Sequence, residues 1–442
     1  MLCLDEESSF RSQKYVLCLD VVQIICDFCD LKTQLNLIQA CKEYDENLKI
    51  RKLTCTEEEN NKRITQNILE QKKFNQLRYL NASYNEKIIN VNHLKDTLIE
   101  LHCTRNCGIQ QEGINELRKL QILDASSNKK ITNVNHLKDT LIDLSCVWDD
   151  CGIRQEGIKE LRKIQKLNAD DNEKITNVNH LKDTLIELNC EGDCGIHEKG
   201  INELRRLQKL DAFGNKKITN VDHLKDTLIE LNCGGRCGIR QEGINELQKL
   251  QKLNASHNEK ITNVNHLKDT LIDLNCSFYC GIHQKGITEL RKLQKLNATE
   301  NEKITNVNHL KDTLIELHCG YCGIDQEGIN ELQKLQILDA YDNKKIINVN
   351  HLKDTLIELD CQGSCGIHQE GIKELRKLQI LDISENEKIT NVNHLKDSLI
   401  ELYCRYGGGI KKEGINELRK LQKLEAYWNE PNLIQNFYYK WS

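Results

Sequence analysis

The chain repeats one block of about 43 residues from near residue 77 almost to its C-terminus. An asparagine in phrases such as "LNASYNEKI" marks each copy and returns at intervals of 42 to 44 residues. A period of this size is typical of a solenoid, in which each unit buries its apolar face against its neighbours. Such a stack offers a long surface and seldom a catalytic pocket, so we expect a binding protein and no enzyme. The markers are Asn85, Asn128, Asn172, Asn215, Asn258, Asn301, Asn343, Asn386 and Asn429.

Charge and cysteine content narrow the class of protein. The 62 basic and 67 acidic residues are mixed along the chain, which argues against a protein that tracks nucleic-acid phosphates. No apolar run approaches the ~18–20 residues of a membrane span, and the start "MLCLDEESSF" lacks the features of a signal peptide. The 21 cysteines are odd in number, so free thiols in a reducing compartment are expected. These features predict a soluble, cytoplasmic protein.

Each block divides into two unequal turns. The first is typified by residues 250–267, "LQKLNASHNEKITNVNHL", and the second by residues 271–290, "LIDLNCSFYCGIHQKGITEL". Both begin L-x-x-L-x-A/C, a period-two pattern that favours a short strand with its leucine and its small residue facing inward. Both end with apolar residues three or four apart, which favours a helical or 3₁₀ return. The unit is therefore predicted to place its strands in parallel, as an α/β solenoid.

This pattern resembles the leucine-rich-repeat family, whose hallmark is L-x-x-L-x-L-x-x-N/C-x-L. Residues 314–324, "LIELHCGYCGI", match it without a gap, and "CGIRQEGINEL" resembles the cysteine-containing subclass. The resemblance implies a horseshoe of 17 or 18 turns with parallel strands on its concave face. It places a degenerate first repeat or N-terminal cap at 50–76, double units at 77–429 and a C-terminal cap at 430–442.

Residues 15–49 do not share the period and follow an N-terminal tail of residues 1–14. Apolar positions at helical spacing flank a break near Asp30, and the stretch resembles an F-box. Cys18, Cys29 and Tyr44 depart from that motif, where Pro, Leu and Trp are usual. The alternative is a helical cap over the first exposed repeat. If it is an F-box, the resemblance implies docking to the Skp-type adaptor of a cullin ligase through Leu17, Val21, Ile24, Leu31, Leu35 and Leu37.

An F-box before leucine-rich repeats implies the substrate-recognition subunit of an SCF-type ubiquitin ligase, whose repeats hold the target protein. The alternative is a stand-alone leucine-rich-repeat interaction scaffold. Neither function needs a cofactor, a nucleic acid or a membrane. The near-identical repeats, rich in Asn, Lys and Ile, are also similar to repeat proteins of giant amoeba-infecting DNA viruses, which would place the chain in the host cytoplasm.

Two columns of residues are tempting as metal ligands. Cysteine pairs such as Cys276 and Cys280 recur in seven turns, and a histidine such as His266 recurs in every "NVNHLKD"-type phrase. Successive copies are separated by a whole turn of the other type, so they lie roughly 10 Å apart, too far to share a tetrahedral zinc. We therefore predict a buried ladder of thiols and a structural or solvent-exposed histidine column.

The predicted strands carry acid and base in alternation. The position before the inner leucine is Glu or Asp in every Cys-type turn, such as Glu230, and often Lys in the Asn-type turns, such as Lys252. Neighbouring strands then set opposite charges side by side, which contributes about 0.2–1 kcal/mol per pair. The array neutralises itself, and no catalytic pair of acids is predicted.

The residues just after each strand vary while the core phrases hardly change. They are enriched in aromatics, although only 5% of the chain is aromatic. Exposed aromatics are common anchors of protein interfaces, whereas drift in tolerant loops is the alternative explanation. We predict a target-binding rim made by Tyr84, Trp148, Phe213, Phe278, Tyr279, Tyr321, Tyr341, Tyr406, Tyr427 and Trp428.

Overall fold

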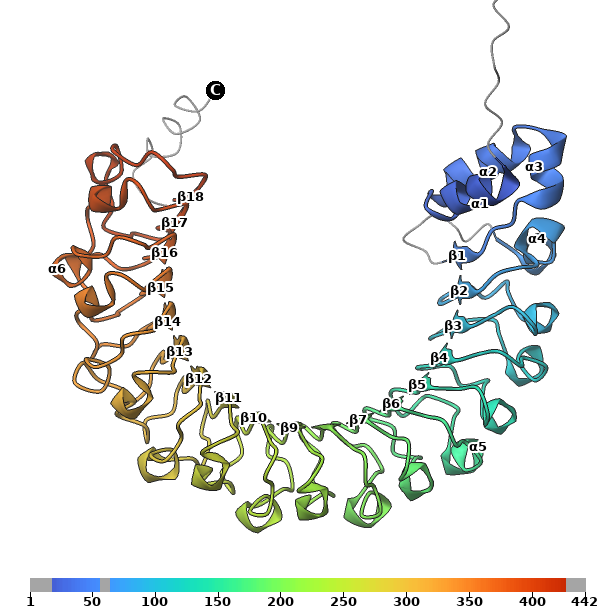
Figure 1. The fold of residues 1–442 in the computed structure, drawn as a ribbon, viewed down its shortest axis with the longest axis horizontal. Coiled ribbons are helices and arrows are strands. Elements are labelled where there is room, and N and C mark those ends of the chain that lie inside the picture. Colours follow the sequence, from blue (N-terminus) through green and yellow to red (C-terminus); the bar gives the residue numbers. More distant parts are fainter. Residues whose placement is uncertain (1–17, 56–63, 427–442) are drawn as a thin grey trace, which may run out of the picture. The chain divides into compact units, whose positions relative to one another are not determined.

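A computed structural model describes residues 18–55 and 64–426, which form two compact units divided after Ile164. Both units stack short parallel strands that alternate with tight returns (Figure 1). Within the described residues no helix has the length and apolar content needed to cross a bilayer.

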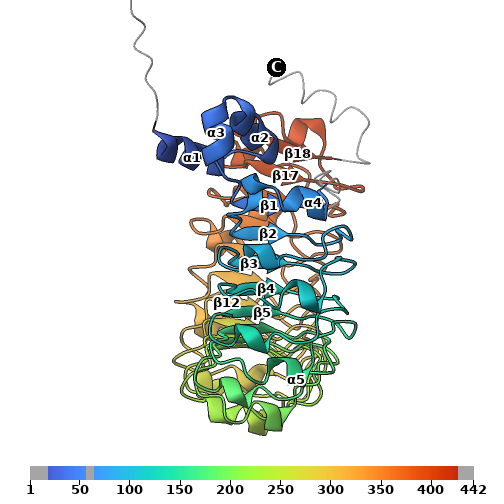
Figure 2. The ribbon, with the colours of Figure 1, turned by 90° about the vertical axis from the view of Figure 1, so that its right-hand side faces the viewer.

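The first unit begins with three helices and continues with five strands. Figure 2 shows the helices beyond β1, at the N-terminal end of this stack. The elements are α1 (Leu19–Asp27), α2 (Leu31–Gln39), α3 (Lys42–Asn47), β1 (Lys52–Thr54), α4 (Gln66–Leu69), β2 (Tyr79–Asn81), β3 (Glu100–His102), β4 (Ile122–Asp124), β5 (Asp143–Ser145) and α5 (Gln155–Ile158).

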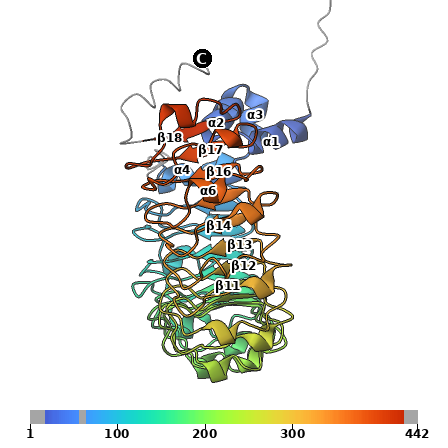
Figure 3. The same cartoon turned by 90° about the vertical axis from the view of Figure 1, so that its left-hand side faces the viewer.

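The second unit contains thirteen strands and one short helix among its described residues. Figure 3 shows β11 to β14 and β16 to β18 of this unit stacked one above another. The elements are β6 (Lys166–Asn168), β7 (Glu187–Asn189), β8 (Lys209–Asp211), β9 (Glu230–Asn232), β10 (Lys252–Asn254), β11 (Asp273–Asn275), β12 (Lys295–Asn297), β13 (Glu316–His318), β14 (Ile337–Asp339), β15 (Glu358–Asp360), α6 (Gln369–Ile372), β16 (Ile380–Asp382), β17 (Glu401–Tyr403) and β18 (Lys423–Glu425).

Most returns contain 3₁₀ turns of three residues, as the spacing of their apolar side chains predicts. In the Asn-type turns they cover Asn92–Leu94, Asn135–Leu137, Asn179–Leu181, Asp222–Leu224, Asn265–Leu267, Asn308–Leu310, Asn350–Leu352 and Asn393–Leu395. The others cover Lys72–Phe74, Gln111–Gly113, Glu198–Gly200, Gln241–Gly243, Gln284–Gly286 and Lys412–Gly414. In each unit the strands line the concave side of the stack and the returns line its convex side (Figure 1).

The core of each unit is built from rows of identical side chains. The central leucine of every strand from Leu53 to Leu402 is at most 2% exposed, and it faces the same leucine of the next strand in register. The small residue after each strand is buried as well, as Ala255 and Cys276 illustrate. This confirms the predicted inward direction of the L-x-x-L-x-A/C phrase. Stacking of like on like is what allows three-residue strands to form a stable sheet.

The marker asparagines fasten each Asn-type turn to the turn before it. The Asn258 side chain is buried, and its Nδ2 donates to the carbonyls of Cys233 (2.8 Å) and Ile239 (3.2 Å). Its Oδ1 accepts the backbone N–H of Lys260 at 3.0 Å. The same contacts recur at Asn128, Asn215, Asn301, Asn343 and Asn386. One amide side chain thus satisfies three backbone groups that would otherwise be buried without partners.

Helices α1 and α2 match the two predicted within 15–49, with the break at Asp30, whereas α3 was not predicted. Asp30 caps α2 by accepting the backbone N–H of Thr33 at 2.7 Å, which is why the helix starts there. Gln23 of α1 both donates to and accepts from the backbone of Lys49, each at 2.8 Å. This contact attaches α1 to the segment that leads into β1. The division into an F-box-like domain and a repeat domain stays a prediction.

Candidate functional site

Every loop that follows a strand from β2 to β17 has a residue in the left-handed conformation at the third position after the strand, and the loops after β9, β11 and β17 have a second one (Arg236, Tyr279 and Gly407). The φ of the residue at the third position lies between 48° and 72° in all of these described turns. We call this set the left-handed column. It consists of Tyr84, Arg105, Ser127 and Trp148 in the first unit, and of Asp171, Gly192, Gly214, Gly235, His257, Phe278, Glu300, Tyr321, Asp342, Gly363, Glu385 and Tyr406 in the second.

Backbone hydrogen bonds between turns fix this conformation. The N–H of Arg105 donates to the carbonyl of Ser126 at 2.9 Å, and the N–H of Phe278 donates to that of Thr299 at 2.8 Å. The same bond joins most neighbouring turns, so the parallel ladder continues past the strands into the loops. The conformation is therefore a property of the stack and not of the side chain at that position.

The left-handed region is unfavourable for most side chains. It costs roughly 1–2 kcal/mol for residues other than Gly, with Asn and Asp partly excepted. Glycine occupies the column at Gly192, Gly214, Gly235 and Gly363, so the fold accepts the residue that avoids this cost. Five other turns carry Tyr, Trp or Phe there instead. Strained positions that persist without a structural need are typical of functional surfaces.

The structure places the described members of the predicted rim in these loops. Most are exposed: Tyr84 by 38%, Trp148 by 39%, Tyr279 by 71%, Tyr321 by 49% and Tyr406 by 58%. Phe213 and Tyr341 are also exposed and directly precede a left-handed residue, and Phe278 is half-buried. Tyr427 and Trp428 lie outside the described residues.

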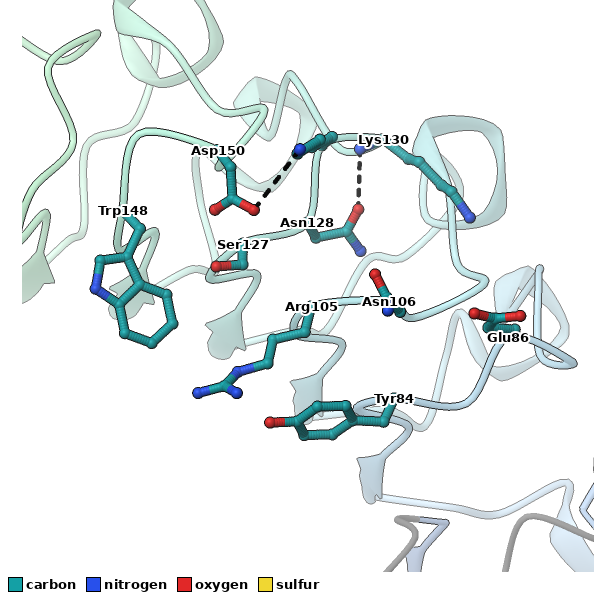
Figure 4. Close-up of a pocket in the computed structure, with 10 residues that line it drawn as sticks. Tyr84, Glu86, Arg105, Asn106, Ser127, Asn128, Lys130, Trp148 and Asp150 are labelled. Carbon is teal, nitrogen blue, oxygen red and sulfur yellow. Dashed lines mark hydrogen bonds and ion pairs between the residues drawn. The ribbon is translucent and has the colours of Figure 1, made fainter.

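In the first unit the rim side chains surround an open hollow of about 860 Å³ (Figure 4). Arg105 lies between two rings, with its guanidinium carbon 5.2 Å from the ring centroids of both Tyr84 and Trp148. Ser127, from the turn between Arg105 and Trp148, contributes only a short side chain to the wall. Lys129 and Asp150, 4.0 Å apart, form another part of the lining.

In the second unit the aromatics form separate groups. The rings of His257 and Phe278 stack in parallel at 4.8 Å, and those of Tyr321 and Tyr341 meet edge to face at 5.3 Å. Phe213 covers the backbone of Gly235, where an added Cβ would lie 2.5 Å from the ring. The loops of the second unit therefore present several aromatic groups along the stack.

Sequence reasoning selected the aromatics and missed Arg105. The sequence did contain a sign of its role, because Arg105 occupies the same loop position, the third after a strand, as Tyr84, Ser127 and Trp148. The left-handed conformation was also missed. The glycines that occupy this third loop position in other turns could have indicated a left-handed backbone, because glycine favours that conformation.

The strand face confirms the predicted alternation of charges. Lys252 contacts Glu230 at 3.2 Å, and Lys295 contacts Glu316 at 2.6 Å, in the strand registers observed. The lysines are exposed and the glutamates partly so, and each pair therefore contributes little to stability.

Some acidic groups on the second unit are not neutralised in this way. Burial, followed by the neighbouring Asp211 and Asp170, raises the pKa of Glu191 to about 7. Burial chiefly raises the pKa of Asp360 to about 6, with Asp339 and Asp382 on the adjacent strands adding to the effect.

The cysteines form the predicted buried ladder. Cys276 and Cys280 are at most 1% exposed, and burial raises the pKa of Cys280 to about 11, so the thiol stays protonated. Among the residues that the structure describes, no group of three or more His, Cys, Asp or Glu is placed to hold a metal ion.

The histidine column lies on the outer returns. Nε2 of His309 donates to the carbonyl of Ile287 at 3.0 Å, and His351 and His394 make the equivalent bond. Partial burial lowers the pKa of these rings. The observed contact is a structural link between turns, as predicted.

The predicted adaptor-binding residues divide by exposure. Val21 (38%) and Ile24 (55%) on α1 are exposed, whereas Leu31, Leu35 and Leu37 on α2 are half-buried. Leu17 lies outside the described residues. Ile25 (45%) and Phe28 (88%), which the sequence analysis did not select, extend the exposed apolar surface of α1.

Comparison with solved structures identifies the fold. A leucine-rich-repeat protein of Leptospira interrogans is similar over 78% of this chain and 95% of its own, with 23% identity and a TM-score of 0.52. Two Listeria monocytogenes proteins match more loosely. The internalin inlF has 18% identity over 78% of this chain and 87% of its own, with a TM-score of 0.39. The functional domain of InlJ, which includes a cysteine ladder, has 19% identity, coverage of 75% and 74%, and a TM-score of 0.44.

No protein-family model and no curated protein sequence matches the chain. The strand architecture and the Leptospira structure together confirm the predicted leucine-rich-repeat solenoid. The F-box and the viral likeness stay predictions.

The strain in the left-handed column predicts the order of two substitutions at the exposed Tyr406. Asn tolerates φ near 55° better than Ala does, so Tyr406→Asn should be more stable than Tyr406→Ala by about 1 kcal/mol. Urea unfolding of both variants measures the difference. Equal midpoints, or a higher midpoint for the alanine variant, would contradict the strain argument.

The raised pKa of Glu191 predicts that the stability of the fold depends on pH. The folded-state pKa of about 7 exceeds the ordinary value, so ionisation penalises the folded state as pH rises from about 4.5 through 7. Glu191→Gln should therefore unfold at a higher urea concentration than the wild type at pH 8 and at a similar one at pH 4.5. Solvent screens this partly exposed group, so the gain should be about 1 kcal/mol. Asp211→Asn, which removes the neighbouring charge, should reproduce part of the gain.

Proposed function

We propose that the chain is a protein-binding scaffold that recognises its partner through the left-handed column and the aromatics beside it. The observation that carries this proposal is the presence of Tyr, Trp and Phe at positions where the backbone favours glycine. These side chains are largely exposed, so they contribute little to the core. Exposed aromatics on a rigid support lose little conformational freedom on binding, which suits them as interface anchors.

The hydrogen-bonded ladder supports the same proposal. It holds the loops in a fixed conformation, so a partner would meet a pre-formed surface instead of one that must be ordered on binding. The separate aromatic groups along the second unit suit an extended protein segment better than a small molecule.

A random-peptide display selection on the full-length chain tests this function. Peptides selected on the wild type should bind at least ten-fold more weakly to a Tyr279→Ser/Tyr321→Ser variant, because two exposed anchors are lost. Ile89→Ser/Ile347→Ser is the matched control, since these residues are 46% exposed on return segments. Equal losses in both variants would show that general stickiness, and not the rim, accounts for binding.

We further propose that α1 docks the Skp-type adaptor of a cullin ligase and that the rim holds the protein to be ubiquitinated. The observation that favours this role is the exposed apolar surface of Val21, Ile24, Ile25 and Phe28 at the N-terminal end of the first unit. Charged side chains such as Lys32 and Asp30 border it. The alternative is a stand-alone scaffold in which these helices only cap the stack.

Capture of a purified Skp-type adaptor by the tagged full-length chain separates the two roles. An F-box should capture the adaptor, and Val21→Asp/Ile24→Asp should abolish capture, since both side chains are exposed and their loss spares the core. Lys42→Asp, at a side chain that is 90% exposed on α3, is the control and should leave capture intact. Failure of the folded wild type to capture the adaptor would remove the ligase role and leave the scaffold.

A further inference from the structure

The hollow in the first unit contains a cation, Arg105, that is not paired with either of the acids that line it. No hydrogen bond or ion pair engages the guanidinium of Arg105 within the described part of the chain, and its contacts are with the rings of Tyr84 and Trp148. The five N–H donors of an arginine are normally used when its position is fixed. Here the rings fix the position and leave the donors at the edge of the guanidinium available.

Two other arginines near the strands, Arg405 and Arg51, show the contrasting arrangement. Arg405 contacts Asp382 at 3.1 Å and Glu425 at 3.7 Å, and Arg51 contacts Asp27 at 2.9 Å. The remaining cations of the hollow are engaged as well: Lys129 with Asp150, and Lys130 through Nζ with the carbonyl of Cys107 at 3.3 Å. Arg105 is therefore the cation of the hollow that has no partner among the described residues.

The surrounding side chains leave room at Arg105 for a ligand group. Arg105 and Trp148 belong to turns separated by the turn of Ser127, and the short serine side chain does not fill the gap (Figure 4). The guanidinium is planar by delocalisation, and the two neighbouring rings shield part of it from water. A flat guanidinium with free donors matches the two oxygens of a carboxylate in a bidentate pair.

We propose that the hollow around Arg105 binds the carboxylate of an Asp or Glu side chain in an acidic segment of the partner protein. This inference rests on the proposed protein-binding function and names the chemistry that the first unit recognises. A singly charged carboxylate fits one free guanidinium. A phosphate dianion fits less well, because Glu86 and Asp150 also line the hollow and would repel it.

Displayed random peptides selected on the full-length chain provide the probe. Each selected peptide is synthesised with its acids intact and as an amide copy, in which Asp is replaced by Asn and Glu by Gln. On the wild type the amide copy should bind at least ten-fold more weakly than the acidic peptide. On Arg105→Gln the two should bind equally, because the group that distinguishes them is gone.

Two more variants separate charge from shape. Arg105→Lys keeps the charge but loses the planar guanidinium, so it should recover only part of the preference for acid. A third copy of each peptide replaces its Asp and Glu residues by Lys. Arg105→Glu should bind this lysine copy more tightly than the acidic peptide, and an unfolded variant could not gain such binding. The side chain is exposed, and Gln, Lys and Glu meet the same left-handed backbone that arginine already adopts, so these substitutions are compatible with folding, which circular dichroism checks.

The outcomes distinguish this inference from the function on which it rests. Equal binding of acidic and amide peptides to the wild type overturns the inference. Peptides that depend on Tyr279 and Tyr321 but not on Arg105 also overturn it, while leaving the protein-binding rim in place. A selection that yields no binding peptide overturns both.

Discussion

The backbone hydrogen-bond ladder between successive turns is the interaction on which the rest of this structure depends. Three-residue strands supply few such bonds, and the ladder gains length by continuing into the loop that follows. The buried leucines can stack in register only because the ladder fixes the offset between turns. The asparagine side chains then connect the start of each return to the preceding turn, where the ladder has ended.

The same ladder explains why the functional surface lies where it does. It imposes a left-handed residue on each loop and directs that residue away from the core. A side chain at this position can change without disturbing a buried contact, at a strain of roughly 1–2 kcal/mol. Residues as different as Gly192, Arg105 and Trp148 can therefore occupy the same left-handed position in equivalent loops. The fold separates the residues that hold the stack from the residues that are free to meet a partner.

Arg105 and Arg405, two arginines of the rim loops, illustrate how one scaffold produces different local chemistry. Arg405 follows a strand whose neighbours supply Asp382 and Glu425, so its charge is neutralised within the protein. Arg105 follows a strand whose neighbouring loops supply Tyr84 and Trp148, so its charge remains available. Helix α1 at the N-terminal end also has one face that packs inside the protein and one that is exposed. It buries Val22 and Cys26 and leaves Val21, Ile24 and Phe28 exposed.

Period and pattern alone determined the solenoid, the inward leucines such as Leu274, the buried thiols and the pairing of Lys252 with Glu230. Each follows from a repeat that places identical residues at identical positions, so one turn predicts all the others. Only the tertiary structure decided that the third loop residue is left-handed and that Arg105 lies between two rings. It also decided which apolar side chains of α1 are exposed. These features arise from contacts between different turns, such as those of Arg105 with Tyr84 and Trp148, which lie 21 and 43 residues away. The loops that make these contacts differ in length by a residue or two, so no local pattern fixes the direction of a side chain.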